Sequence, residues 1–136
     1  MSGRFDEMRE RMRSALLEPD SVERDVLVAV PYEWAGRRDV EIAVEQPEYT
    51  SVCPMTGLPD FGTVEVRYEP GDSILELQSF KFYLLQYRQV GIFYEHAANR
   101  ILDDLVAVVA PRRMTVTLRM TARGGIATEV QARHGG

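Results

Sequence analysis

Apolar residues recur every three or four positions in three stretches of the chain, a spacing typical of helices with one buried face. The three predicted helices span residues 4–17, 80–89 and 94–109. We expect Ser79 to cap the second helix, because a short hydroxyl side chain satisfies the first backbone N–H groups. Gly91 is expected to end that helix. Pro111 is expected to stop the third helix.

Other stretches alternate polar and apolar residues, which predicts half-buried strands. These strands cover residues 38–44, 63–68, 114–121 and 126–132, and shorter extended segments are predicted at 25–30 and 73–77. Arg123-Gly124-Gly125 predicts a hairpin turn between the last two strands. Residues 46–62 are rich in Pro, Thr, Gly and Asp, which predicts a long loop of the kind that often carries function.

The predicted order is strand, strand, helix, helix, strand, strand, behind an N-terminal helix. This order favours an α+β fold in which an antiparallel four-stranded sheet carries two helices on one face. A length of 136 residues predicts one domain over 1–136, with an N-terminal helical extension at about 4–18. The chain has no internal repeat and no linker that would divide it.

Composition narrows the function classes. Hydrophobic residues make up 45% and charged residues 27%, which indicates an ordered globular chain. A net charge of −5 argues against a direct nucleic-acid partner. There is no apolar run of the ~18 residues that a membrane span needs, and no signal peptide, so we expect a cytoplasmic protein. The single cysteine excludes an internal disulfide.

Cys53 and Asp60 are the first candidates for chemistry. Both lie in the predicted loop, which Pro54, Gly57 and Pro59 hold. A loop thiol close to a group that handles protons is a candidate nucleophile. The alternatives are a small buried cysteine and an aspartate that only caps a turn.

Charged residues around the second and third helices have two interpretations each. Glu76 lies between leucines and is expected to be buried, where it needs a structural Arg or a ligand with donor groups. Lys81, the only lysine, shares a helix face with Arg88, which favours an anion site or an ordinary solvated face. Glu95 lies near the start of the third helix, where its negative charge either stabilises the helix through the helix dipole or binds a ligand. Arg123 faces a ligand or water.

A metal site is not expected. The chain has only two histidines, His96 and His134, and neither forms a recognisable ligand spacing with Cys53.

Four segments together resemble a known family. They are Cys-Pro-x-Thr-Gly-x-Pro-Asp-Phe at 53–61, Glu-Leu-x-Ser-x-Lys-x-Tyr at 76–83, Phe-x-Glu at 93–95 and Arg-Gly-Gly-Ile at 123–126. Their combination and order resemble the short form of the 7-cyano-7-deazaguanine reductases, the nitrile reductases of queuosine biosynthesis. The resemblance covers about residues 45–130. It implies the tunnelling fold (T-fold), whose unit is two strands, two helices and two strands.

The resemblance also implies a mechanism. Cys53 attacks the nitrile carbon of a purine-like substrate and forms a covalent thioimide, while Asp60 protonates the nitrile nitrogen. Two NADPH molecules, used as cosubstrate, then reduce the nitrile to the primary amine. A thiolate is both a good nucleophile and a good leaving group, which suits a step divided through a covalent adduct.

Binding residues follow from the same resemblance. The implied substrate-binding set is Leu75, Glu76, Leu77, Tyr94 and Glu95, and the implied cofactor-binding set is Ser79, Lys81 and, as the weaker candidate, Arg123. Ionised carboxylates suit the N–H donors on the edge of a deazaguanine. The family forms homo-oligomers, two pentameric rings that stack into a decamer, with active sites between subunits.

Two departures from the family pattern bear on this interpretation. Gln78 stands where a first lysine is usual, and Tyr94 stands where the family commonly has histidine. Gln78 keeps two alternatives open. One is an amidinotransferase of the same fold that acts on the same nitrile without NADPH. The other is a purine- or pterin-binding protein with no enzymatic activity.

Overall fold

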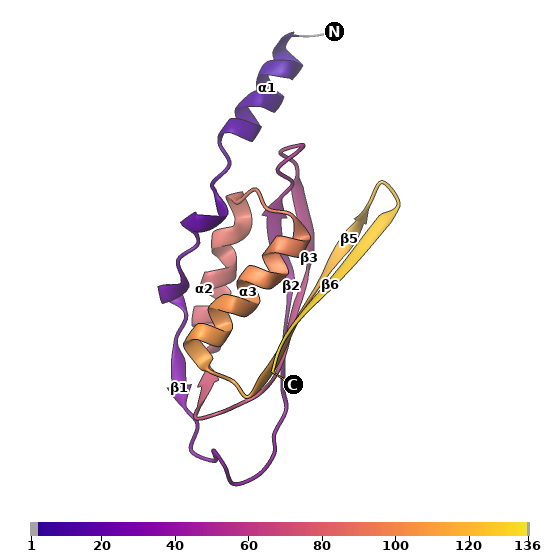
Figure 1. The fold of residues 1–136 in the computed structure, drawn as a ribbon. Helices are drawn as coiled ribbons and strands as arrows, with labels where there is room; N and C mark the ends of the chain where they lie inside the picture. Colours follow the sequence, from indigo (N-terminus) through magenta and orange to yellow (C-terminus); the bar gives the residue numbers. More distant parts are fainter. Residues whose placement is uncertain (1–2, 136) are drawn as a thin grey trace.

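A four-stranded antiparallel sheet with two helices on one face forms the body of the molecule in the computed structural model, which describes residues 3–135 (Figure 1). Its strands, in spatial order, are β2 (Ile42–Val52), β3 (Pro59–Glu69), β5 (Arg113–Arg123) and β6 (Ile126–His134). The two covering helices are α2 (Leu77–Leu85) and α3 (Tyr94–Val109). This architecture confirms the predicted α+β fold and its order of elements.

The core lies between the sheet and the two helices. Along β3, Val64 and Val66 are fully buried while Glu65, between them, points to the other face. From α3, Ile101 and Leu105 pack down onto the sheet at helical spacing. The opposite face of the sheet carries ion pairs, including Arg119 with Glu65 at 2.8 Å. The alternation therefore fixes which face of the sheet the helices cover.

The predicted loop over residues 46–62 is wrong. In the structure β2 continues to Val52 and β3 begins at Pro59, so only residues 53–58 connect them. A β-bulge between Gln46 and Tyr49 breaks the alternation that would have revealed the strand. Of the three prolines that suggested a loop, Pro47 lies at the bulge and Pro59 is the first residue of β3, where a sheet tolerates them, and only Pro54 lies in the connection.

Helix α2 begins earlier than predicted, at Leu77, and its cap is Glu76 rather than Ser79. The Glu76 carboxylate accepts hydrogen bonds from the backbone N–H groups of Gln78 at 2.9 Å and Ser79 at 2.6 Å. A carboxylate that accepts from the first helical N–H groups is a normal N-cap. Glu76 is therefore half-buried and satisfied within the chain, not the fully buried acid that its neighbouring leucines suggested.

Shorter elements connect the layers. These are the 3-10 turns η1 (Pro19–Ser21), η2 (Arg24–Val26) and η3 (Gln86–Gln89) and the paired strands β1 (Ala29–Pro31) and β4 (Ser73–Leu75). The segment predicted as extended over 25–30 is thus split between η2 and β1. In the described part of the chain, no helix has the length and apolar character that a membrane crossing requires.

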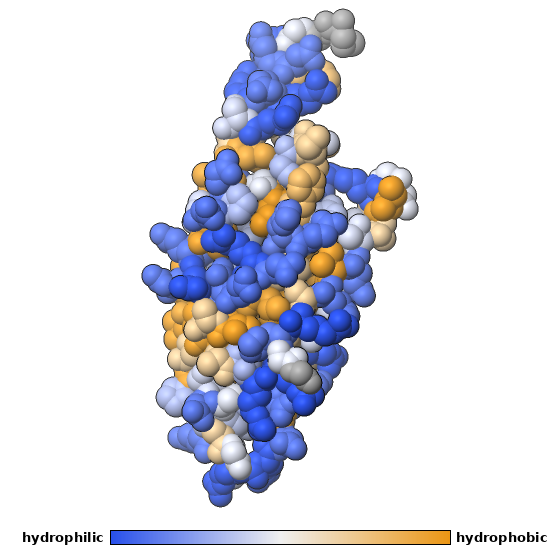
Figure 2. Space-filling view, viewed as in Figure 1, coloured by the Kyte–Doolittle hydropathy of each residue, from blue (hydrophilic) through white to orange (hydrophobic). Residues whose placement is uncertain are grey.

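The N-terminal helix α1 (Gly3–Ser14) extends away from the body, and none of its residues is buried (Figure 1). The predicted helix over 4–17 is confirmed for residues 4–14, and its apolar residues line a cavity of about 520 Å³ together with the loop between β2 and β3. The tip of the β5–β6 hairpin is also apolar (Figure 2), and Ile126 there is 72% exposed.

Candidate active site

The loop between β2 and β3 holds Cys53 in a closed turn. The Cys53 N–H donates to the carbonyl of Leu58 at 3.0 Å, and the Gly57 N–H donates back to the carbonyl of Cys53 at 2.8 Å. Gly57 has φ +76°, a left-handed conformation that glycine adopts without strain. Its neighbour Thr56 accepts the Leu58 N–H through its hydroxyl oxygen at 3.2 Å. The motif glycine and threonine thus shape the turn that presents the thiol.

This turn favours the thiolate. Burial alone would raise the pKa of Cys53, but hydrogen bonds from the Thr56 hydroxyl and from the backbone N–H groups of Thr56 and Met55 outweigh it. The pKa of the thiol therefore lies below its ordinary value, as a nucleophilic cysteine requires.

Asp60 lies near the start of β3, with its side chain turned inward and the residue only 5% exposed. Arg123, at the end of β5, forms an ion pair with one Asp60 carboxylate oxygen and donates to the carbonyl of Pro59 at 2.8 Å. A charge this deeply buried needs such a partner. The hairpin that carries Arg123 thus holds the carboxyl of Asp60 in place.

Tyr94, the first residue of α3, faces the same acid. Burial and then the neighbouring Asp60 carboxylate raise the pKa of Tyr94 above its ordinary value, and its hydroxyl hydrogen-bonds that carboxylate. Backbone pairing brings α3 to this place, because Val52 exchanges hydrogen bonds with Val90 and Ile92 at 3.0 and 3.1 Å. The β2 end that precedes Cys53 is thereby fixed beside the start of α3.

These side chains line one cavity of about 390 Å³. Its walls are Cys53, Pro54, Thr56, Leu58, Asp60, Ile92, Phe93, Tyr94 and Arg123. The cavity brings together a thiol with a lowered pKa and a carboxyl group. It holds both residues expected to be catalytic, Cys53 and Asp60.

The remaining expected site residues lie elsewhere on the chain. Leu75, Glu76, Leu77, Ser79, Lys81 and Glu95 do not line this cavity. Together α2, with 9 residues, and η3, with 4, place Glu76 roughly 20 Å from the Val52–Gly91 contact at their other end. Within a single chain, the expected catalytic residues therefore lie far from most of the expected binding residues.

The Ser79 hydroxyl already has two hydrogen-bond partners within the chain. Its hydroxyl donates to the carbonyl of Glu76 at 2.8 Å and accepts the Val28 N–H at 3.0 Å. Lys81 and Arg88 are exposed on the outer face of α2 and its extension, so they are the cations there that can reach an anionic group. No cluster of three metal-binding side chains occurs within residues 3–135.

Sequence analysis missed two buried hydroxyl groups beside the cavity, those of Tyr49 and Ser51. Both lie on β2, inside the segment interpreted as a loop, and each residue is 1% exposed. The spacing of two residues was the available signal, since it places both side chains on one face of a strand.

Replacing Thr56 with valine is expected to raise the pKa of Cys53, because the change removes the side-chain donor to the thiolate and keeps the branched shape. Alkylation of Cys53 by iodoacetamide should then slow several-fold at neutral pH, and its pH profile should move to higher pH. Thr56→Ser retains the hydroxyl and should keep the profile of the unaltered chain. Equal profiles for all three proteins would show that Thr56 does not set the thiol's acidity.

Comparison with known proteins adds to this geometry. The family model described as QueF-like protein matches residues 59–136. A protein of Chlorobium luteolum named NADPH-dependent 7-cyano-7-deazaguanine reductase is 57% identical over 97 residues, which cover 71% of this chain and 84% of the relative. A protein of the same name from Chlorobaculum tepidum is 58% identical over 93 residues, 68% of this chain and 80% of its own.

A solved structure is also similar. The crystal structure of the archaeosine synthase QueF-Like in the apo form matches with a TM-score of 0.63 and 31% sequence identity. The match covers 72% of this chain and 94% of the solved one. The fold, the cavity residues and the similar proteins therefore indicate the same protein family.

Proposed function

The chain belongs to the family of QueF-like proteins, and from that membership we propose that it is an NADPH-dependent 7-cyano-7-deazaguanine reductase. The reaction takes the nitrile of 7-cyano-7-deazaguanine to a primary aminomethyl group. The observation that carries the proposal is the pair Cys53 and Asp60 in one cavity, with the pKa of the thiol lowered by the turn that holds it.

In the proposed mechanism the Cys53 thiolate attacks the nitrile carbon. A sulfur–carbon bond forms, and one π bond of the nitrile becomes a lone pair on nitrogen, which takes a proton from Asp60. Asp60, which is buried and ion-paired, first accepts the proton of the Cys53 thiol. It then gives this proton to the nitrile nitrogen, so the step needs no other proton source. The product of this step is the covalent thioimide.

NADPH supplies the two hydrides that the reduction needs. The residues of this chain that would hold it are Lys81, with Arg88 on the same exposed face of α2 and its extension. Gln78 keeps a hydrogen-bonding amide in place of the usual positive charge. Ser79 contributes to the site by fixing the start of α2, and Arg123 by holding Asp60.

The substrate is expected to present its N–H edge to Glu76 and Glu95, with backbone contacts at Leu75 and Leu77 and with Tyr94 beside the ring. Hydrogen bonds from the Gln78 and Ser79 backbone N–H groups lower the pKa of Glu76, so it is an ionised acceptor. An ionised carboxylate matches the donors of a guanine-like base.

Mass spectrometry of the intact protein tests this function directly. Incubation with 7-cyano-7-deazaguanine should add the full mass of the ligand, and NADPH should then discharge the adduct to the aminomethyl product. An adduct that NADPH leaves untouched would favour the amidinotransferase, an alternative that Gln78 and the 31% identical archaeosine synthase support. Absence of an adduct would leave a binding protein.

We further propose that the complete site forms between two copies of the chain, in stacked pentameric rings. The roughly 20 Å between Glu76 and the Cys53 end of the chain supports this, because one subunit would supply the catalytic pair and its neighbour the α2 residues. The unpaired edge strands β2 and β6 provide the surfaces on which such rings close.

We place the reaction in the cytoplasm, where a thiol without a disulfide partner stays reduced.

Mixing two inactive variants tests the shared site. Cys53→Ala and Lys81→Ala should each fail to oxidise NADPH with the substrate, and their co-assembled mixture should recover about a quarter of wild-type turnover. Recovery follows because some interfaces join an intact Cys53 to an intact Lys81. A site contained in one chain would give no recovery at any mixing ratio.

A further inference from the structure

The β1–β2 loop, residues 32–41, carries the single tryptophan of the sequence, Trp34, with two arginines stacked on it. The guanidinium carbon of Arg37 lies 4.3 Å from the centre of the Trp34 ring, and that of Arg38 lies 5.1 Å from it. A guanidinium group above an aromatic face is held there by cation–π attraction. Trp34 is still 45% exposed, so the two arginines leave part of the ring open to a ligand.

Backbone hydrogen bonds give this loop its shape. The N–H of Ala35 donates to the carbonyl of Tyr32 at 3.3 Å, and the N–H of Arg37 donates to the carbonyl of Trp34 at 3.0 Å. Gly36, between them, has φ +76°, a conformation that glycine adopts without strain. The chain therefore turns back between Trp34 and Arg37, and the turn brings the arginine beside the ring.

The charges of Arg37 and Arg38 are not neutralised by the chain. Within residues 3–135, neither guanidinium group forms a hydrogen bond or an ion pair, although Glu33 and Asp39 are close to them in sequence. A guanidinium group presents a rigid set of N–H donors that matches the oxygen atoms of a phosphate. Two such groups, held on one aromatic ring, are suited to bind a phosphate that is attached to a flat base.

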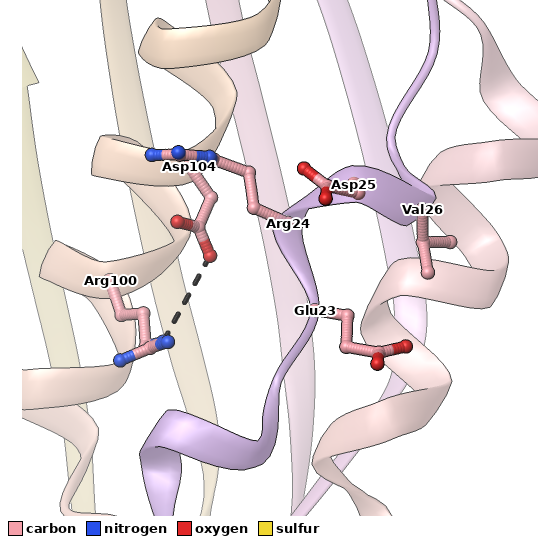
Figure 3. A pocket seen from close by; sticks show the side chains of 6 residues that line it. All are labelled: Glu23, Arg24, Asp25, Val26, Arg100 and Asp104. Atoms are coloured by element: carbon pink, nitrogen blue, oxygen red, sulfur yellow. Dashed lines mark ion pairs between the residues drawn. The ribbon is translucent and has the colours of Figure 1, made fainter.

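The polar cavity in Figure 3 shows a different arrangement of charge. This cavity has a volume of about 580 Å³, and its wall holds three carboxylates and two arginines, from Glu23, Asp25, Asp104, Arg24 and Arg100. The dashed line marks the ion pair of Arg100 with Asp104 at 3.9 Å. The excess of carboxylates would repel an anion there. The β1–β2 loop is therefore the better anion site of the two.

The β1–β2 loop lies one short strand away from the start of α2. The Glu76 N–H donates to the carbonyl of Val28 at 2.9 Å, and the Tyr32 N–H donates to the carbonyl of Asp72 at 2.9 Å. Between these two contacts β1 has 3 residues and is roughly 10 Å long. Figure 1 shows the loop beyond β1, at the end of the molecule opposite α1. A dinucleotide held beside α2 can therefore extend to Trp34.

We propose that the β1–β2 loop binds the adenosine end of NADPH, with Trp34 against the adenine and with Arg37 and Arg38 on the 2′-phosphate. The inference rests on the proposed function, and it extends the cofactor site beyond Lys81. Nucleic-acid bases stack on aromatic rings and on guanidinium groups, and an arginine near the ribose accommodates the 2′-phosphate in other NADP sites. Because NADH lacks this phosphate, the same two arginines select NADPH.

The fluorescence of Trp34 tests this site directly, because no other tryptophan contributes to the signal. Adenosine 2′,5′-bisphosphate, the adenosine end of NADPH without the nicotinamide, should quench this fluorescence until the site is saturated. Adenosine 5′-monophosphate lacks the 2′-phosphate and should need a concentration at least about tenfold higher. In the double variant Arg37→Ala/Arg38→Ala the two nucleotides should bind equally weakly, because the groups that distinguish them are gone.

Turnover should follow the same pattern. The double variant should raise KM for NADPH about tenfold and leave KM for NADH unchanged. Formation of the thioimide should keep its wild-type rate, because that step uses no cofactor. Arg11→Ala is the matched control, since Arg11 is an exposed arginine of α1 that has no ion pair within the described residues 3–135. This control should keep the wild-type quenching and the wild-type KM.

The outcomes separate this site from the proposed function. Unchanged Trp34 fluorescence with the bisphosphate in the wild-type chain, or equal quenching by both nucleotides, would overturn the nucleotide site. Oxidation of NADPH with the nitrile would then still support the reductase. Saturable quenching that favours the 2′-phosphate, in a wild-type chain that never oxidises NADPH, would instead support the nucleotide site and overturn the reductase.

Discussion

Replacing Cys53 with alanine should abolish the covalent adduct and reduce turnover at least about a thousandfold. The expectation follows from the mechanism, because without sulfur no thioimide forms and the nitrile must be reduced in one difficult step. The measurements are intact mass after incubation with 7-cyano-7-deazaguanine and the absorbance of NADPH during turnover. Both signals should vanish together.

The fold should survive this change, which keeps the experiment interpretable. Cys53 is partly exposed in a turn held by backbone hydrogen bonds, so the free energy of unfolding should change by no more than about 0.5 kcal/mol. Cys53→Ser provides a second variant of nearly the same size. Its hydroxyl is a far weaker nucleophile than a thiolate, so it should also form no adduct. Turnover that persists in either variant would exclude the covalent mechanism.

Local pattern was enough to predict most of the fold. The helix over Tyr94–Val109 was predicted at its observed bounds, because Pro111 stops it and its apolar residues keep a steady period. The β5–β6 hairpin was equally plain from Gly124 and Gly125, which both adopt positive φ at the turn. Where the periodicity was continuous, the sequence alone was sufficient.

The failures occur where one local signal hides another. The bulge between Gln46 and Tyr49 interrupts the alternation of β2, and the prolines around it imitate a loop, so the end of the strand was missed. With it went Tyr49 and Ser51, whose burial depends on a pairing register that spans two strands. The cap of α2 was misplaced because Glu76 and Ser79, three residues apart, both suit a helix start. In the structure the Glu76 carboxylate accepts the first helical N–H groups, and the Ser79 hydroxyl instead accepts the N–H of Val28.

The candidate site was predictable in its parts and not in its assembly. Cys53 and Asp60 were singled out from the spacing within the loop, and the structure brings them into one cavity. The ion pair of Asp60 with Arg123 joins residues 63 positions apart, and no local pattern encodes such a contact. The role of Arg123 thus shifts from the cofactor phosphate, its weaker assignment by resemblance, to a proposed role in holding the acid.

Asp60→Asn is expected to slow both adduct formation and turnover by about 10² to 10⁴-fold, the range of a lost general acid. Asparagine has the shape of aspartate but carries no exchangeable acid proton, so the nitrile nitrogen loses its donor. The rate of mass gain with the nitrile and the rate of NADPH oxidation measure the two steps separately. Asp103→Asn, an exposed carboxylate on α3, is the control that should leave both rates unchanged.

The two rates together distinguish a general acid of the first step from a residue that acts only in the later reduction. Because Asp60 acts in the first proton transfer, its loss must slow formation of the adduct as well as turnover. The stability cost of Asp60→Asn should be modest, about 1 kcal/mol, because the side chain of Arg123 is 43% exposed and can turn its charge into solvent. An Asp60→Asn protein that forms the adduct at the wild-type rate would place the proton donor elsewhere in the cavity, with the Tyr94 hydroxyl next in line.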